Sequence, residues 1–173
     1  MPLLLYHEGV LVYHGSNVAV EVPRIITPSR ALDFGSGFYA TMNLGQAESF
    51  AGNVVNRNNG QGIPTVSYYE IDFDRIRRSL NVLEFNSPDN NWLDFVYANR
   101  TLRYTGESFD VVIGPVANDT LYRVFRLFES GDISRETVIE RLKSTRLFNQ
   151  VTFCTDASVS QLKFVKSTAV KNG

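Results

Sequence analysis

The sequence predicts an α+β fold, with strands at both ends of the chain and helices between them. Two observations carry this prediction. Short runs of β-branched and aromatic residues lie near both termini, whereas several inner segments repeat apolar residues three and four positions apart. The 173 residues are expected to form one domain, 1–173, because a second core is not expected at this length.

The first third of the chain is expected to hold two strands, a long loop and a helix. Residues 3–6 and 10–13 are strand-like, and the second run is expected to stop at the turn-like segment 14–17. Prolines and glycines make 18–37 mostly loop. Asn43 followed by Gln46 is typical of a helix cap with its reciprocal partner, which predicts a helix through 47–55.

The remaining elements follow from the same two patterns. After a polar loop at 56–62, strands are predicted at 65–73, 79–85, 109–116, 151–155 and 162–170. Helices are predicted at 89–100 and at 121–128, where Gly131 ends the second one. A third helix is predicted to start after the capping residue Ser134, and a single helical turn is predicted at 157–161.

The composition excludes several classes of protein. The 17 basic and 18 acidic side chains give a net charge of −1, so a general electrostatic grip on nucleic acid is not expected. The basic cluster Arg75, Arg77 and Arg78 is interpreted as solvated surface charge, with a phosphate-binding patch as the alternative. The single cysteine, Cys154, cannot form an internal disulfide, and too few soft ligands are present for zinc.

No apolar stretch approaches the roughly 20 residues that a membrane-spanning helix needs. The opening apolar run lacks a basic flank and is not interpreted as a signal peptide. A cytoplasmic protein without membrane contact is therefore expected. The glycine-rich phosphate motifs of the two usual nucleotide-binding folds are also absent.

Three segments place polar or aromatic residues at a strand end or in a glycine-bearing turn. They are 13–16, the stretch 33–41 with its following helix to Phe50, and 149–153. Taken singly, each has a structural explanation: His14 as a hydrogen-bonded turn residue, Tyr39 as a core aromatic, and Gln150 as a surface residue. Their order and spacing together point to a site.

This combination resembles the ADP-ribosyltransferase superfamily, in its poly(ADP-ribose)-polymerase-like and diphtheria-toxin-like branch. The matching residues are His14-Gly15-Ser16, Gly37-Phe38-Tyr39 with Phe50 eleven positions after Tyr39, and Gln150-Val151-Thr152-Phe153. From about Leu11 to Phe164 the chain also resembles a family of small bacterial proteins assigned to that superfamily. The segments 109–119 and 150–155 carry this closer likeness.

The resemblance implies split antiparallel β-sheets with flanking helices and NAD as the co-substrate. His14, Tyr39 and Gln150 would be catalytic, with His14 on the adenosine ribose. Gly15 would let the nicotinamide carboxamide approach the backbone, because it has no Cβ. Tyr39 and Phe50 would stack on the pyridinium ring. Gly37, Ser16 and Ser36 would also contact the dinucleotide, the two serines through ribose or phosphate groups, and Ala47 replaces a serine found in many relatives.

Gln150 departs from the glutamate that relatives usually carry at this position. A glutamine oxygen still accepts a hydrogen bond, but it bears no full charge and cannot act as a base. Glu107, in the turn before a predicted buried strand, is the candidate for a compensating carboxylate. The expected activity is mono-ADP-ribosylation of a protein or nucleic acid by a toxin or effector, which would imply a neutralising partner protein. The alternatives are an NAD glycohydrolase, a silent NAD- or ADP-ribose-binding module, and a structural protein that binds no nucleotide; polymer elongation is the least expected outcome.

Overall fold

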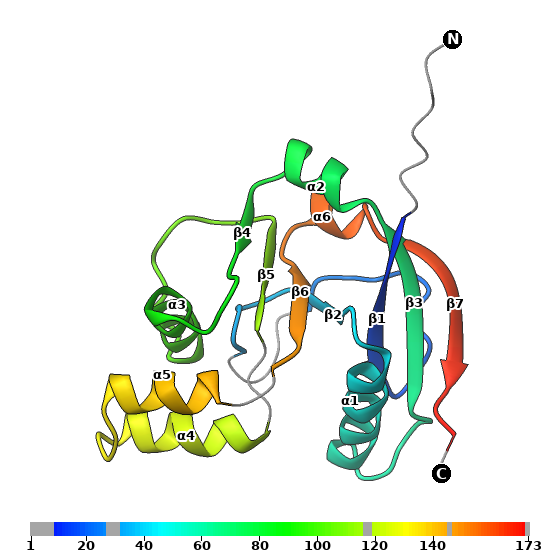
Figure 1. Cartoon of the computed structure of the whole chain (residues 1–173). Helices are drawn as coiled ribbons and strands as arrows, with labels where there is room; N and C mark the ends of the chain where they lie inside the picture. The colour runs from blue at the N-terminus through cyan, green and yellow to red at the C-terminus, as the bar shows by residue number, and fades with distance from the viewer. Residues whose placement is uncertain (1–8, 27–31, 116–118, 145–146, 172–173) are drawn as a thin grey trace.

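The computed structural model describes residues 9–26, 32–115, 119–144 and 147–171, and these form a mixed α+β fold (Figure 1). The strands are β1 (Val10–Ser16), β2 (Phe38–Thr41), β3 (Thr65–Ile71), β4 (Val82–Glu84), β5 (Val111–Pro115), β6 (Asn149–Phe153) and β7 (Lys163–Ala169). The helices are α1 (Leu44–Arg57), α2 (Phe73–Ser79), α3 (Asn90–Arg100), α4 (Asp119–Glu129), α5 (Arg135–Lys143) and α6 (Asp156–Val159). The predicted α+β class is confirmed.

All seven strands belong to one hydrogen-bonded sheet, in the order β4-β5-β6-β2-β1-β3-β7. The expectation of antiparallel pairing needs one correction, because β4 and β5 run parallel while the other neighbours are antiparallel. The reason is that α3 lies between β4 and β5 in the chain, and a crossover of this length returns the second strand in the same direction.

The junction between β1 and β2, here called the seam, is the weakest link in the sheet. β1 and β2 share a single registered pair, Tyr13 with Thr41, whereas β1 pairs with β3 along its whole length. In Figure 1, β1, β3 and β7 form one half of the sheet and β4, β5 and β6 the other, with β2 between them. Beyond Tyr13, the end of β1 is therefore not part of a ladder with β2.

Two apolar clusters lie on opposite faces of this sheet. The first core packs helices α3, α4 and α5 against the face that carries Val112 of β5 (Figure 1). The second core lies on the other face, around Val111 and Ile113 of the same strand, with Ile76 of α2. Because side chains alternate along a strand, the same strand serves both cores.

Helix caps read from the sequence are present. Ser134 caps α5, and the Asn43 side chain accepts the backbone N–H of Gln46 at 2.8 Å. Asp89, which was predicted only as the start of a helix, caps α3. The reciprocal half of the Asn43 cap is wrong, because the Gln46 side chain binds the Thr41 hydroxyl at 2.7 Å instead. This bond ties the first turn of α1 to the end of β2.

Several predicted boundaries shift. β1 continues through His14-Gly15-Ser16 rather than ending before them, and β6 begins at Asn149, which places Gln150 inside a strand. The strand predicted at 65–73 ends at Ile71, because Asp72 caps the short helix α2. The strand predicted from residue 79 starts only at Val82, since α2 occupies the residues before it.

Some expectations lie outside the described residues: the strand at 3–6, part of the 18–37 loop around Pro28, and the side chain of Leu121. The basic cluster at 75–78 lies on α2, where exposed Arg77 pairs with Glu84 at 3.1 Å. In the part of the chain that the structure describes, no helix has both the length and the apolar character needed to cross a bilayer.

Candidate functional site

A cleft of about 1010 Å³ opens at the seam of the sheet. Its floor is built from β1, β2 and Gln150 of β6, which are adjacent strands. One wall is α1. Arg24, Leu32 and Asp33 line another side, and Arg126 of α4 with Leu147 and Phe148 forms the wall near β6. The volume lies at the upper end of the roughly 300–1,000 Å³ typical of ligand pockets.

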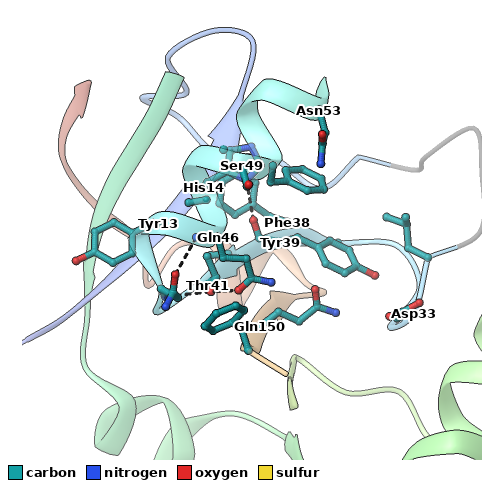
Figure 2. Close-up of a pocket in the computed structure, with 18 of the residues that line it drawn as sticks. Tyr13, His14, Asp33, Phe38, Tyr39, Thr41, Gln46, Ser49, Asn53 and Gln150 are labelled. Atoms are coloured by element: carbon teal, nitrogen blue, oxygen red, sulfur yellow. Dashed lines mark hydrogen bonds between the residues drawn. The ribbon is translucent and has the colours of Figure 1, made fainter. Parts of the chain in front are cut away.

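His14 is held in one orientation beside the seam. Its side chain lies on the second-core face, where the ring stacks on Phe38 with centroids 4.2 Å apart. Its Nδ1 lies 2.6 Å from the backbone carbonyl of Tyr39 (Figure 2). Because a carbonyl only accepts, Nδ1 carries the proton and Nε2 keeps a lone pair.

The charge of His14 is set by burial. Desolvation lowers the pKa of the imidazole below 6.5, and the bond to the Tyr39 carbonyl offsets part of this shift. His14 is therefore neutral at neutral pH. In that state Nε2 suits a hydroxyl donor of a ligand better than a phosphate oxygen.

The Tyr39 side chain is held by two hydrogen bonds at its hydroxyl. Its hydroxyl donates to the Gly35 carbonyl and accepts the Phe34 N–H at 3.2 Å. Burial raises the pKa of the phenol far above its ordinary value of 10, so Tyr39 stays protonated and is not a base. The loop 33–35 thus sets the orientation of the ring, and the residue contributes an aromatic surface to the cleft (Figure 2).

Gln150 lies next to Tyr39 on the same face of the sheet, since Thr41 pairs with Gln150 and Tyr39 pairs with Thr152. Its side chain is only 8% exposed, and its amide nitrogen Nε2 is buried with no hydrogen-bond partner among the described residues. An unpartnered buried amide costs about 1–3 kcal/mol. A ligand acceptor in the cleft would remove this cost.

Helix α1 lines the cleft with one face, which carries three polar side chains and Phe50. Phe50 is 42% exposed, and the guanidinium of Arg57 lies 5.3 Å from the centre of its ring. Residues three, four and seven positions apart share one face of a helix, and the lining residues Gln46, Phe50, Asn53 and Arg57 follow that spacing. Sequence reasoning had found only Phe50, although this spacing was visible in the sequence.

Gly15 lies against helix α1. A Cβ on Gly15 would lie 2.1 Å from the Ala47 backbone oxygen and 2.8 Å from the Ala51 nitrogen. Glycine is therefore required so that α1 can pack on β1, and its expected role in the approach of a ligand stays a prediction. Gly37 lines the cleft too, but its Cβ would meet the Phe153 carbonyl at 2.7 Å, so it is required by packing against β6.

The other predicted residues are placed as follows. Ser16 and Ser36 do not line the cleft: Ser16 binds Asn17 at 3.3 Å, and Ser36 is exposed. Glu107 does not line it either, because its carboxylate binds the Asn81 amide at 2.9 Å. Ala47 does line the cleft and is almost fully buried, as the packing against Gly15 requires.

Charge is distributed unevenly in the cleft. Arg24, Arg57 and Arg126 line it, and Asp33 is the only acidic lining residue among those described. The Asp33 carboxylate lies 3.5 Å from the Arg100 guanidinium and raises the pKa of neighbouring Tyr39 by its charge (Figure 2). The cleft therefore favours an anionic ligand. Sequence reasoning had named none of these arginines.

Together these features define a mixed α+β protein whose ligand-sized, cationic cleft lies at the seam of one sheet. The chain belongs to the family described as Protein of unknown function (DUF3990), whose model matches residues 10–164. No curated protein and no solved structure matches the chain.

Proposed function

We propose that the protein is an NAD-dependent mono-ADP-ribosyltransferase acting on a macromolecule. One observation carries the proposal: His14, Tyr39 and Gln150, which come from three distant segments of the chain, line one cleft on three adjacent strands. The resemblance implies split sheets, whereas the structure has one sheet whose β1–β2 junction is joined by a single registered pair. A role as toxin or effector rests on the resemblance alone.

The chemistry of the lining fits a dinucleotide in several ways. Neutral His14 offers a lone pair for a ribose hydroxyl, as argued from its bond to Tyr39. Tyr39 and Phe50 offer aromatic surface for a pyridinium ring, which an aromatic face attracts as a cation. Arg24 and Arg57 suit a diphosphate. The end of β1 that is unpaired with β2 leaves backbone groups near Gly15 for a carboxamide.

Gln150 is consistent with transfer from NAD because nicotinamide leaves as a neutral molecule and needs no proton. A glycosidase, in contrast, must protonate its leaving oxygen and keeps two carboxylates. The role of Gln150 is then to hold a ribose hydroxyl while positive charge develops at C1′. Its side-chain oxygen would accept the hydrogen of that hydroxyl, and its unpartnered Nε2, which only donates, would bind an acceptor atom of the ligand.

Incubation of the purified protein with NAD labelled in the adenosine part separates the candidate functions. Labelled protein or nucleic acid, with release of nicotinamide, is the expected result. Nicotinamide release without a labelled macromolecule would instead establish the glycohydrolase. Saturable binding without turnover would leave the silent binding module, and no binding of NAD would overturn the proposal.

A further inference from the structure

The wall of the cleft near β6 has its own chemistry. Arg126 of α4 lines it together with Leu147 and Phe148, which lead directly into Gln150. The other two arginines belong to different parts of the cleft: Arg57 lies over Phe50 on α1, and Arg24 follows β1. In Figure 1, α4 and α1 lie on different sides of β2 and β6. If NAD binds on the α1 side of the cleft, as the proposed function implies, the guanidinium of Arg126 is left to bind the second substrate, which is the acceptor of ADP-ribose.

Among the described residues that line the cleft, no strong base lies near Gln150 for activating a neutral nucleophile. Gln150 is an amide, Tyr39 holds its proton, and burial makes His14 a weak base. Glu107 lies outside the cleft, and Asp33 is paired with Arg100. An acceptor that is already anionic needs no proton removed before it attacks.

We propose that the acceptor is a terminal phosphate monoester of a nucleotide or nucleic acid, bound by Arg126 with its base against Phe148. This inference rests on the proposed function. The C1′–N bond to nicotinamide breaks with its electron pair going to nitrogen, and a phosphate oxygen forms the new bond to C1′. No proton is transferred. Guanidinium suits phosphate, and aromatic rings suit bases of any sequence.

A terminal phosphate is compatible with the balanced net charge of −1, which disfavours a grip on a long phosphate backbone. One phosphate and one base need only one local arginine and one ring. The proposal therefore predicts recognition of an end, with little dependence on length.

The activity test uses NAD and single-stranded oligonucleotides of one sequence that carry a 5′-phosphate, a 3′-phosphate or no phosphate. A nucleoside monophosphate and a phosphoserine peptide complete the set. Mass spectrometry measures the gain of an ADP-ribosyl group, and free nicotinamide is measured in the same reaction. We expect product on at least one phosphorylated end and on the mononucleotide, and none on the unphosphorylated oligonucleotide.

Arg126→Gln should lower the ratio of nucleotide product to nicotinamide released by at least about tenfold, the loss typical of one charge-assisted contact. Arg123→Gln is the matched control, because Arg123 is exposed on the same helix and does not line the cleft. A binding test needs no turnover: a fluorescent oligonucleotide with a terminal phosphate should bind more tightly than its unphosphorylated form. Arg126→Gln should remove that difference, and Arg123→Gln should retain it.

Nicotinamide release with no phosphate-dependent product and no phosphate-dependent binding would overturn the acceptor proposal and leave the NAD proposal standing. Equal modification of the phosphopeptide would also overturn it, because the base would then play no part. Absence of both NAD binding and nicotinamide release would overturn the proposed function, and the acceptor proposal with it.

Discussion

Gln150 is the residue on which the proposed chemistry of the cleft depends. A carboxylate at this position would stabilise developing positive charge more strongly than an amide does. We predict that Gln150→Glu raises nicotinamide release by about tenfold or more, since comparable electrostatic contacts contribute roughly 10²–10³ in rate. The measurement is the initial rate at saturating NAD.

Asn149→Asp is the control for Gln150→Glu, because it adds the same charge one residue away, at an exposed position outside the cleft lining. A rate that rises equally in both variants, or that falls in Gln150→Glu, would contradict the placement of Gln150 at the reacting ribose.

Gln150→Ala should abolish turnover and change the affinity for NAD by no more than about tenfold, since it removes one contact among many.

His14 gives a prediction about pH. The unfolded chain takes up the imidazole proton near pH 6.5, and the folded protein takes it up only at a lower pH. The free energy of unfolding should therefore decrease as the pH falls below 6.5, and this contribution levels off below the folded-state pKa. NMR titration of the ring protons of His14 measures the shift, in a His7→Gln variant that leaves one histidine. A midpoint at or above pH 6.5 would contradict the neutral, acceptor form of the ring.

Among the elements, α1 and β1 pack closely at Gly15, where no side chain separates their backbones. Gly15→Ala should destabilise the protein by about 1–3 kcal/mol, because the new methyl group meets main-chain atoms of α1 and forces the helix to move. Denaturant unfolding followed by circular dichroism measures the change.

Gly52→Ala is the opposite case on the same helix, since its Cβ would have nothing within 4 Å. It should stabilise the protein by about 0.5–1 kcal/mol through helix propensity. If both variants were destabilising to the same degree, the loss in Gly15→Ala would not come from the contact with α1.

Most elements could be predicted from the sequence because their signals are local. Asp89, Ser134 and Asn43 cap helices through bonds to residues three positions away, and such spacing is readable in a single chain. Helix α2 was missed because seven residues with one buried apolar anchor, Ile76, show no clear period. The end of β1 was missed because a glycine normally ends a strand, and here a distant helix requires it.

For the molecule as a whole, the sequence predicted that the three motif residues would line one cleft, but it did not predict the positive charge of that cleft. His14, Tyr39, Gln150, Gly15, Gly37 and Phe50 all line the cleft, whereas Ser16 and Ser36 do not. Arg24 and Arg126 come from segments with no motif of their own. Arg24 and Arg126 reach the same cleft only because of the order of the strands in the sheet. That order could not be read from the sequence.

Binding of NAD should stabilise the whole fold. At a concentration one hundred times its Kd, a ligand adds about 2.7 kcal/mol. For a chain of this size that corresponds to a rise in Tm of roughly 5–10 °C. Scanning calorimetry should find this shift for the protein and for Tyr97→Ala, which packs against Phe128 away from the cleft. Tyr39→Ala should lose it, and a Tm that does not respond to millimolar NAD in any variant would contradict NAD binding.

The contact between Gly15 and α1 also limits how these positions can change together. The atom that a Cβ at 15 would strike is the carbonyl oxygen of residue 47, which every amino acid possesses. Replacing Ala47 by glycine would therefore not rescue a larger residue at 15, as it would if two side chains competed for space. A side chain at position 15 could therefore be accommodated only by a shift of the α1 backbone, which would also move the cleft wall that carries Gln46, Phe50 and Asn53.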